Sequence, residues 1–369
     1  MGEKKREIGS YFYFSESEEG LDRGKLKVEQ FQKSQYLATC RSAIDVVLKS
    51  KFWTNKVALI PGFTCHAVLE PFLRNGFEVI SYDINKDLST NREQFLEVIK
   101  NHNPDVILVH DYFGFPTNEV LREKEVKSVI AAESIEVIID KTQSMFSNIP
   151  DYSVDYKCVG SIRKWLEIPD GAFLCGVSID GDLEEDNEML HAMKKAMNYK
   201  CQYISNGTGN KDTLLGLYRE AEMILDNERL AYTMSSLARY LFNKCDFEQL
   251  KFRRQSNYQY LLNQLISYNF FEIPLSKLND SIVPFYFPIF VKKGRKEFQN
   301  YLAKRDIYAT IIWGCPEYLK DKISDTCRRI YDEILCIPCD QRYTTDDMKY
   351  ICDVVFDYSK MLLNKGCVE

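Results

Sequence analysis

The feature that most constrains the fold is a regular alternation of short apolar runs and helix-like stretches between residues 36 and 180. Between these runs lie stretches in which the apolar residues have helical spacing. Runs this short and apolar are typical of strands buried on both faces, and helices between them make the sheet mostly parallel. The sequence therefore predicts an α/β fold with ligands beyond the carboxyl ends of the strands. The strand-like runs are Val57–Ile60, Val79–Tyr82, Val106–His110 and Val137–Ile139, and the helix-like stretches are Ala43–Lys51, Val68–Leu73, Phe95–Ile99 and Glu119–Ala132.

The pattern changes after about residue 185. Glu188–Lys200 and Thr213–Leu265 have largely helical spacing, with polar breaks. The aromatic run Ile282–Val291 predicts a strand, which its prolines make edge-like or interrupted. Leu335–Ile337 predicts a short strand and Thr345–Leu363 a closing helix. Since 369 residues are too many for one simple core, we expect a large lobe over residues 1–245 and a smaller C-terminal α/β lobe over residues 246–369.

Composition and charge exclude several classes of partner. The net charge is −6 and there is no long basic run, which argues against nucleic acid or an anionic membrane as a partner. No apolar run approaches the roughly 18 residues of a membrane span, and no signal peptide is recognisable. The 12 cysteines follow no framework spacing, so we expect reduced thiols and a cytoplasmic protein. The single CxxC, Cys336–Cys339, has no second pair nearby, and we predict no metal site.

A strand-end carboxylate and a later lysine are the candidate chemistry of this chain. Val137–Ile139 ends in Asp140, and Lys164 follows 24 residues later. A lysine that forms an imine and a carboxylate that keeps a pyridine nitrogen protonated are what pyridoxal 5′-phosphate (PLP) requires. Strands often end in Asp and lysines are common on surfaces, so the spacing alone leaves an ordinary structural role open. Lys141 is a rival lysine, but as the strand-end neighbour of Asp140 it should point to the opposite face.

The order of these signals resembles the DegT/DnrJ/EryC1/StrS family, which comprises sugar aminotransferases of PLP fold type I. The likeness runs from about residue 8 to residue 356, and the order and spacing of its motifs are more specific than any single motif. It implies the PLP-dependent transferase fold type I, with a large lobe built on a mostly parallel sheet and a smaller C-terminal lobe. The segments that carry it are Leu37–Leu48, Leu59–Val68, Tyr82–Ile84, Val109–Pro116, Asp140–Gln143, Ser161–Lys164 and Leu335–Met348.

Four site residues follow from the resemblance in the middle of the chain. Asp140 would pair with the pyridinium nitrogen of PLP, and Gln143 would hydrogen-bond its phenolic oxygen. Ser161 would bind the phosphate, and Lys164 would be the Schiff-base lysine. The gap between Ser161 and Lys164 is three residues, where the family usually has five.

The phosphate segment departs from the family pattern. Thr39, Cys40 and Arg41 stand where the family has Ser, Gly and Thr at the start of a helix whose N-terminus binds the cofactor phosphate. Thr39 keeps a hydroxyl group and Cys40 keeps its backbone N–H. Arg41 could pair with the phosphate directly.

The residue expected to pack on the cofactor ring also departs from the pattern. Cys65 stands where the family often has an aromatic residue. Either Cys65 contacts the ring weakly, or Phe63 or His66 takes over that role. His110, at the end of its strand, is interpreted as structural rather than catalytic, and Trp313 falls in a loop that faces substrate in the family.

The resemblance implies an aminotransferase that uses an amino-acid donor, glutamate in this family, and a keto acceptor such as a nucleotide-linked keto sugar. A homodimer is expected by analogy. Sugar dehydratases of the same family carry His at the lysine position, so Lys164 argues against that activity. Two alternatives stay open: other PLP chemistry on the same fold, or a non-catalytic sensor protein, which the altered Thr39–Arg41 segment and the missing aromatic residue would suit.

Overall fold

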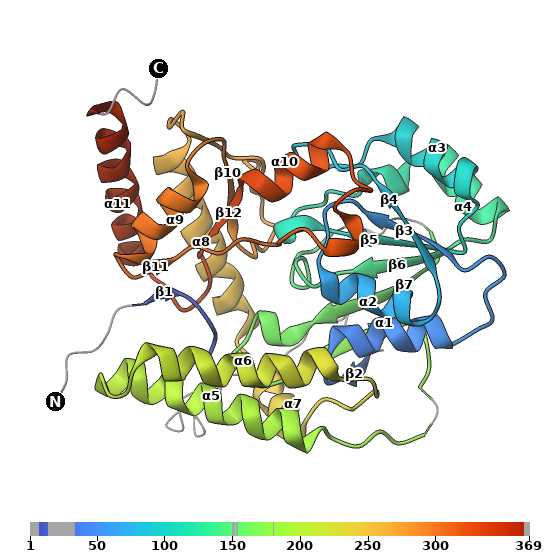
Figure 1. Ribbon diagram of the computed structural model, residues 1–369, viewed down its shortest axis with the longest axis horizontal. Helices are drawn as coiled ribbons and strands as arrows, with labels where there is room; N and C mark the ends of the chain where they lie inside the picture. The colour runs from blue at the N-terminus through green and yellow to red at the C-terminus, as the bar shows by residue number, and fades with distance from the viewer. Residues whose placement is uncertain (1–6, 14–33, 150–151, 153, 180, 365–369) are drawn as a thin grey trace.

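The computed structural model describes residues 7–13, 34–149, 152, 154–179 and 181–364. Residues 1–6, where the predicted large lobe begins, and residues 365–369, where the predicted small lobe ends, lie outside these ranges. Two sheets with their helices make up most of the described chain, and a pair of long helices lies beside the larger sheet (Figure 1).

The larger sheet has seven strands in the order β2-β8-β7-β6-β5-β3-β4. β3 to β7 pair in parallel, whereas β8 and β2 add antiparallel strands at one side. All five residues of β5 are buried, as expected of an apolar strand covered on both faces. The predicted mostly parallel sheet is therefore confirmed. The strands are β2 (Gln35–Leu37), β3 (Val57–Pro61), β4 (Glu78–Tyr82), β5 (Val106–His110), β6 (Glu136–Asp140), β7 (Tyr156–Ser161) and β8 (Ala172–Cys175).

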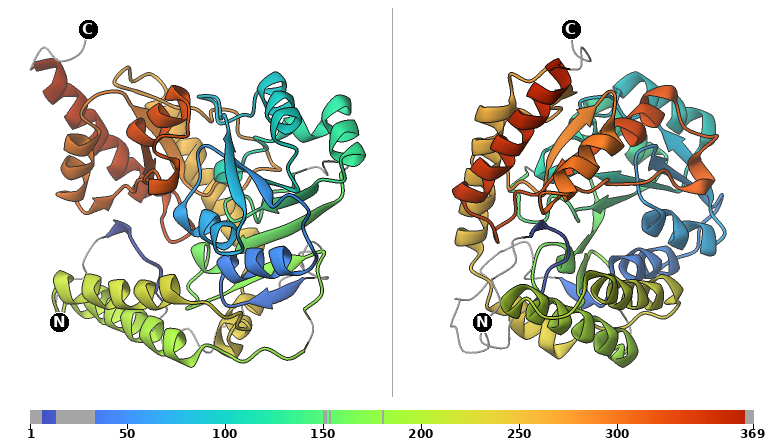
Figure 2. Two further views of the ribbon diagram at one scale, coloured as in Figure 1. Left: turned by 45° about the vertical axis from the view of Figure 1, so that its right-hand side comes forward. Right: turned by 60° about the vertical axis from the view of Figure 1, so that its left-hand side comes forward.

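Helices cover both faces of this sheet (Figures 1 and 2). α1 (Cys40–Lys49) and α2 (His66–Arg74) lie on one face, and α3 (Arg92–His102) and α4 (Lys124–Ala132) lie on the other. The chain runs outward from β3 to β4 and then returns past β3 to β5, and right-handed crossovers place the helices of the two directions on opposite faces. This reversal is where such sheets bind ligands, beyond their carboxyl ends.

Local deviations from the predicted helices have simple causes. α1 begins at Cys40, three residues before the predicted start, because Thr39 caps it by accepting a hydrogen bond from Ser42 N. The predicted helix over 119–132 divides into a 3₁₀ turn, η4 (Glu119–Arg122), and α4. Two further 3₁₀ turns, η3 (Tyr112–Gly114) and η5 (Ile162–Lys164), directly follow β5 and β7.

A helical hairpin lies beside the sheet. α5 (Asn187–Asn206) and α6 (Lys211–Asn227) pack side by side around a small apolar cluster of their own (Figure 1). α7 (Ser236–Asn243) follows, and its N-terminal cap Ser235 is held by the buried carboxyl group of Asp170 through its N–H at 2.8 Å and its hydroxyl at 2.6 Å.

The second sheet is antiparallel and has the order β12-β10-β9. The aromatic run that was predicted to be an edge-like or interrupted strand is interrupted, since only Phe287–Val291 form the strand β10. This strand is central in the sheet and is not an edge strand. Pro288 is accommodated because it pairs with Cys336 of β12 on one side, while the short β9 on the other side reaches only Phe290 and Val291. The elements are β9 (Phe271–Glu272), β10 (Phe287–Val291), β12 (Ile334–Ile337), α8 (Phe247–Leu265), α9 (Arg295–Ala303), η6 (Glu317–Leu319), α10 (Asp325–Glu333) and α11 (Thr345–Asn364).

The N-terminal segment reaches the C-terminal part of the chain. β1 (Ile8–Gly9) pairs in parallel with β11 (Ile307–Tyr308), and Gly9 N donates a hydrogen bond to the Tyr343 hydroxyl at 2.7 Å. Sequence patterns gave no sign of this two-residue pairing. Within the described ranges, no helix is long and apolar enough to cross a membrane.

Candidate active site

Two polar side chains face each other at the carboxyl ends of β5 and β6. His110 and Asp140 are partners in the strand register, and both are about 95% buried, with exposed fractions of 4% and 5%. His110 Nδ1 lies 3.4 Å from Asp140 Oδ2, and Thr142 N donates to Asp140 Oδ1 at 2.8 Å. Both oxygens of the carboxylate are therefore held in place.

These partners keep Asp140 ionised. Burial alone would raise the pKa of the Asp140 carboxyl, and it is the largest single influence. The hydrogen bond and charge of His110, together with the hydrogen bonds of Thr142, outweigh burial and hold the pKa below its usual value. The site thus offers a dry, negatively charged group, which suits an electron-poor ring carrying a protonated nitrogen.

His110 links Asp140 to the loop between β3 and α2. While Nδ1 faces Asp140, His110 Nε2 forms a hydrogen bond with the Thr64 hydroxyl at 2.8 Å. Thr64 in turn is fixed by the hydroxyl of Tyr331, which lies 2.8 Å from both its backbone N and its backbone O. The interpretation of His110 as a structural residue agrees with this chain of contacts.

Trp313 brings the C-terminal part of the chain to the same place. Its ring centroid lies 5.2 Å from that of Phe63 and 5.6 Å from that of His110. Phe63 is fully buried in this cluster, whereas His66 is exposed on the first turn of α2. Phe63 is thus already packed among aromatic rings.

Lys164 ends the 3₁₀ turn η5, which directly follows β7. The next residue, Trp165, is fully buried and donates its indole N–H to Thr142 O at 2.6 Å, which fixes the turn against the end of β6. Lys164 itself is half-buried, and in the described part of the chain no side chain or carbonyl pairs with its amine. The amine is thus available for covalent chemistry.

Two cysteines show that Lys164 and Asp140 share one environment. Burial is the main cause that raises the pKa of both the Cys40 and the Cys65 thiol. Each thiol also feels the positive charge of Lys164 and the negative charge of Asp140. Thr142 connects them further, since its hydroxyl lies 3.8 Å from Cys40 Sγ. Both cysteines are therefore neutral neighbours of the candidate site.

The rival lysine has different neighbours. Lys141 Nζ lies 6.0 Å from the centroid of the Tyr156 ring, and its electrostatic partners are Cys158, Tyr156 and Asp111. Lys164 instead acts on Cys40, Cys65 and Glu222. The two lysines thus lie in separate environments, as strand alternation predicts.

The N-terminus of α1 is built to receive an anion. Thr39 Oγ1 accepts from Ser42 N at 3.1 Å and lies 2.8 Å from Ser42 Oγ. The backbone N–H groups of Cys40 and Arg41 belong to the first turn, where the helix itself supplies no acceptor. Together with the helix dipole they can hold a phosphate group.

Arg41 points away from this terminus. Its guanidinium group donates to Leu225 O at 2.6 Å and to Asp226 Oδ1 at 2.8 Å, both at the end of α6. Its Nε also lies 3.6 Å from Glu70 Oε2. The side chain is thus engaged in joining α1, α2 and α6, which limits what it can give to a phosphate.

Gln143 and Ser161 flank Asp140 and Lys164. Gln143 Oε1 accepts from Phe113 N at 2.9 Å, so the remaining polar groups of its buried amide are N–H donors. Ser161 ends β7 and is anchored by its N–H to Thr142 Oγ1 at 3.0 Å. Both positions suit donors to an oxygen-rich ligand.

The residues present fit PLP. A lysine amine with no partner among the described residues, a buried ionised carboxylate and a helix N-terminus correspond to the aldehyde, the ring nitrogen and the phosphate of this cofactor. Fold and site together fit a PLP-dependent aminotransferase of fold type I.

Comparison with known proteins finds one family whose sequence pattern matches part of the chain. The sequence model of the DegT/DnrJ/EryC1/StrS aminotransferase family matches residues 185–356. Over these residues the chain is similar to members of this family. Among curated proteins, none matches the sequence.

Solved structures share the fold at low sequence identity. PseC of Helicobacter pylori, an aminotransferase involved in the biosynthesis of pseudoaminic acid, has 14% identity and a TM-score of 0.66 over 96% of this chain and 100% of its own. The sugar aminotransferase CalS13 of Micromonospora echinospora has 15% identity and a TM-score of 0.61 over 88% and 86%. NtdA of Bacillus subtilis, solved with bound PMP, has 14% identity and a TM-score of 0.62 over 89% and 73%.

Sequence reasoning missed several residues that build the site. Thr142 contacts Asp140, Cys40, Ser161 and Trp165, yet a threonine in a loop carries no sequence signal of its own. Glu222, on α6, forms a two-pronged ion pair with Arg163 and could not be expected from a position 59 residues away.

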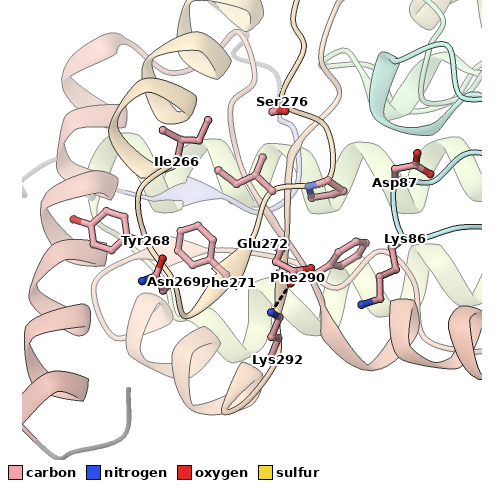
Figure 3. Close-up of a pocket in the computed structure, with 12 residues that line it drawn as sticks. Lys86, Asp87, Ile266, Tyr268, Asn269, Phe271, Glu272, Ser276, Phe290 and Lys292 are labelled. Atoms are coloured by element: carbon pink, nitrogen blue, oxygen red, sulfur yellow. Dashed lines mark ion pairs between the residues drawn. The ribbon is translucent and has the colours of Figure 1, made fainter. Parts of the chain in front are cut away.

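An open hollow of about 680 Å³ lies apart from these residues, between β9, β10 and the loop after β4 (Figure 3). Aromatic side chains form part of its wall, and Lys292 and Glu272, which form an ion pair, also line it. None of the residues that line it belongs to the candidate site.

Proposed function

We propose that this protein transfers an amino group from an amino-acid donor, glutamate, to a nucleotide-linked keto sugar. The observation that carries the proposal is the placement of Asp140 and Lys164 beyond two adjacent parallel strands, β6 and β7. Thr142 ties the two ends together, because it hydrogen-bonds to Asp140 and to Ser161 and Trp165, the residues on either side of the lysine turn. Bound PLP supplies an electron sink for the electrons of the donor Cα–H bond.

The residues of this chain have distinct roles in the proposal. Lys164 would hold PLP, and its amine would take the proton from the donor α-carbon. Asp140 stays ionised and pairs with the ring nitrogen. Gln143 donates to the phenolic oxygen. The phosphate is held by Ser161 and by the N-terminus that Thr39 caps, through the N–H groups of Cys40 and Arg41.

The ring neighbour is a further part of the proposal. Cys65 caps α2 without a side-chain hydrogen bond, and its thiol is neutral because burial raises its pKa. We place it against the cofactor ring, with the aromatic cluster of Phe63 and Trp313 behind His110.

A sugar acceptor is supported by the relatives. CalS13 is named a sugar aminotransferase, and PseC acts in the biosynthesis of pseudoaminic acid. A panel of nucleotide-linked keto sugars, assayed for amine transfer after loading with glutamate, tests this part. If the enzyme transfers the amine to simple keto acids but to none of these sugars, the proposal would be restricted to an amino-acid aminotransferase.

The cofactor assignment has a direct test. Purified protein with added PLP should be yellow, and borohydride should bleach the visible band. The variant Lys164→Ala should lack the band, whereas the control Lys141→Ala should keep it. A wild-type protein that takes up no PLP would favour the sensor alternative. Glutamate should then remove the band of the wild type, and failure with several donors would favour other PLP chemistry.

Assembly and organisation complete the proposal. We propose a cytoplasmic homodimer, because enzymes of fold type I usually complete their sites across a dimer. We place the boundary of the two lobes between residues 245 and 246, in the link between α7 and α8. Light scattering tests the dimer, and limited proteolysis tests the boundary.

A further inference from the structure

Arg163, the residue directly before Lys164, is held by a carboxylate from a distant helix. Its Nη1 donates to Glu222 Oε1 at 3.0 Å, and its Nη2 donates to Glu222 Oε2 at 3.2 Å. The two parallel bonds match the geometry in which a guanidinium group binds any free carboxylate. Glu222 belongs to α6, so this pair joins the lysine turn to the helical hairpin.

The pair lies beside Lys164 and is reachable from solvent. Side-chain exposure is 22% for Arg163 and 33% for Glu222. Glu222 is close enough to Lys164 to feel its charge: burial would raise the Glu222 pKa, but Arg163 and then Lys164 lower it. A small anion that approaches Lys164 therefore meets Arg163.

A partly exposed tyrosine, Tyr11, packs on the helix that carries Glu222. Tyr11 stacks on Tyr218, one turn of α6 from Glu222, with ring centroids 3.9 Å apart, and it is 40% exposed. Burial and then the charge of Glu222 raise the pKa of the Tyr11 hydroxyl, and the charge of Arg163 partly offsets them.

Two other arginines near the site are held differently. Arg254 is 1% exposed and donates to the carbonyls of Pro284 and Phe285. Arg41 is held by Leu225 O as well as by Asp226. A backbone carbonyl cannot move away independently of its chain, whereas the Glu222 side chain can rotate. Arg163 is therefore held by an exchangeable partner.

We propose that Arg163 binds the α-carboxylate of the amino donor and that Glu222 occupies this place until the donor arrives. The exchange replaces one carboxylate by another, so Arg163 never loses a charged partner and no bond other than hydrogen bonds is broken. A carboxylate in the place of Glu222 would lie within reach of the charges of both Arg163 and Lys164, as Glu222 does. This inference rests on the proposed transamination and adds the residue that selects the donor.

Binding of glutarate tests the inference without any reaction, because glutarate has carboxylates but no amine. Calorimetry on the PLP-loaded protein should show that Arg163→Met raises the dissociation constant of glutarate about tenfold or more, as expected for a lost charged hydrogen-bond pair. Glu222→Gln should lower it a few-fold, because the competing charge is gone. Arg329→Met, which breaks the exposed pair with Glu333 on α10, is the matched control and should leave it unchanged.

The opposite direction of the two effects separates binding from a structural role. If the pair only supports the fold, both variants would weaken glutarate binding alike, and the inference would be overturned. The double variant Arg163→Met with Glu222→Gln leaves no unpaired charge and should bind as weakly as Arg163→Met; wild-type affinity in it would also refute the inference. Loss of the visible band on adding glutamate to the wild type tests transamination separately. A wild type that fails there contradicts the proposed function, whereas a normal half-reaction in Arg163→Met contradicts only this inference.

Discussion

Replacing His110 should raise the pKa of the Asp140 carboxyl. PLP binding should then depend on pH in a range where that of the wild type does not. In the wild type, the hydrogen bond and charge of His110 offset burial and keep the pKa of Asp140 low. Without them burial dominates, and the pKa rises. A hydrogen bond to a charged group contributes about 1.5–3 kcal/mol, and the 3.4 Å separation puts this one at the lower end. About 1.5 kcal/mol corresponds to roughly one pH unit, or a tenfold change in the ionisation constant.

The direction of the pH shift follows from the role of Asp140, which binds PLP in its ionised form. A carboxyl with a lowered pKa stabilises the fold above its unfolded pKa, and this contribution is lost as pH falls through the lower folded value. In His110→Ala the loss moves to higher pH. The acid limb of PLP binding and of the glutamate half-reaction should therefore shift upward by about one pH unit.

PLP binding followed by absorbance across the acid range measures this shift. His110→Gln, which keeps a donor toward Asp140, should restore part of it, and the exposed His102→Ala on α3 should show none. An acid limb of His110→Ala that coincides with that of the wild type would refute the reasoning that His110 controls Asp140.

Three further variants test the remaining electrostatics. Arg41→Met should lower the free energy of unfolding in urea by about 1–3 kcal/mol, because it removes the hydrogen bonds between α1 and α6. The affinity for PLP should stay within a few-fold of wild type, and a large loss of affinity would show that the Arg41 side chain does bind the phosphate. Burial raises the pKa of Asp170 to about 6, so the wild type should lose stability as pH rises from about 4 to 6, and Asp170→Asn should remove that slope; equal slopes would contradict it. Burial and then the charge of Arg342 lower the pKa of Lys200 to about 7, so the stability of the wild type should rise between about pH 7 and 10. Lys200→Met should lack this rise, and a melting temperature that rises with pH as in the wild type would contradict the prediction.

The large sheet was predictable because its strands are local apolar runs. Val106–His110 and Val137–Ile139 are buried on both faces, and their parallel pairing brings His110 and Asp140 together without further information. The strand β2 and the two-residue pairing of β1 with β11 were not predicted, because two or three residues are too few to show a periodicity.

The site was predictable where a residue follows a strand and not where a partner comes from a distant element. Asp140 and Lys164 follow β6 and β7, and the structure brings both to Cys40 and Cys65. Glu222 comes from α6, and only the packing of the hairpin brings it to Arg163. Pro288 shows the converse case: its residue type favours an edge, but the shortness of β9 lets it lie in a central strand.

The most direct test of the account is to identify the residue to which PLP is attached. Borohydride reduction of the PLP-loaded protein, followed by proteolysis and mass spectrometry, should find the reduced pyridoxyl group on Lys164 alone. The same group on Lys141 or on another lysine, with Lys164 unmodified, would contradict the account.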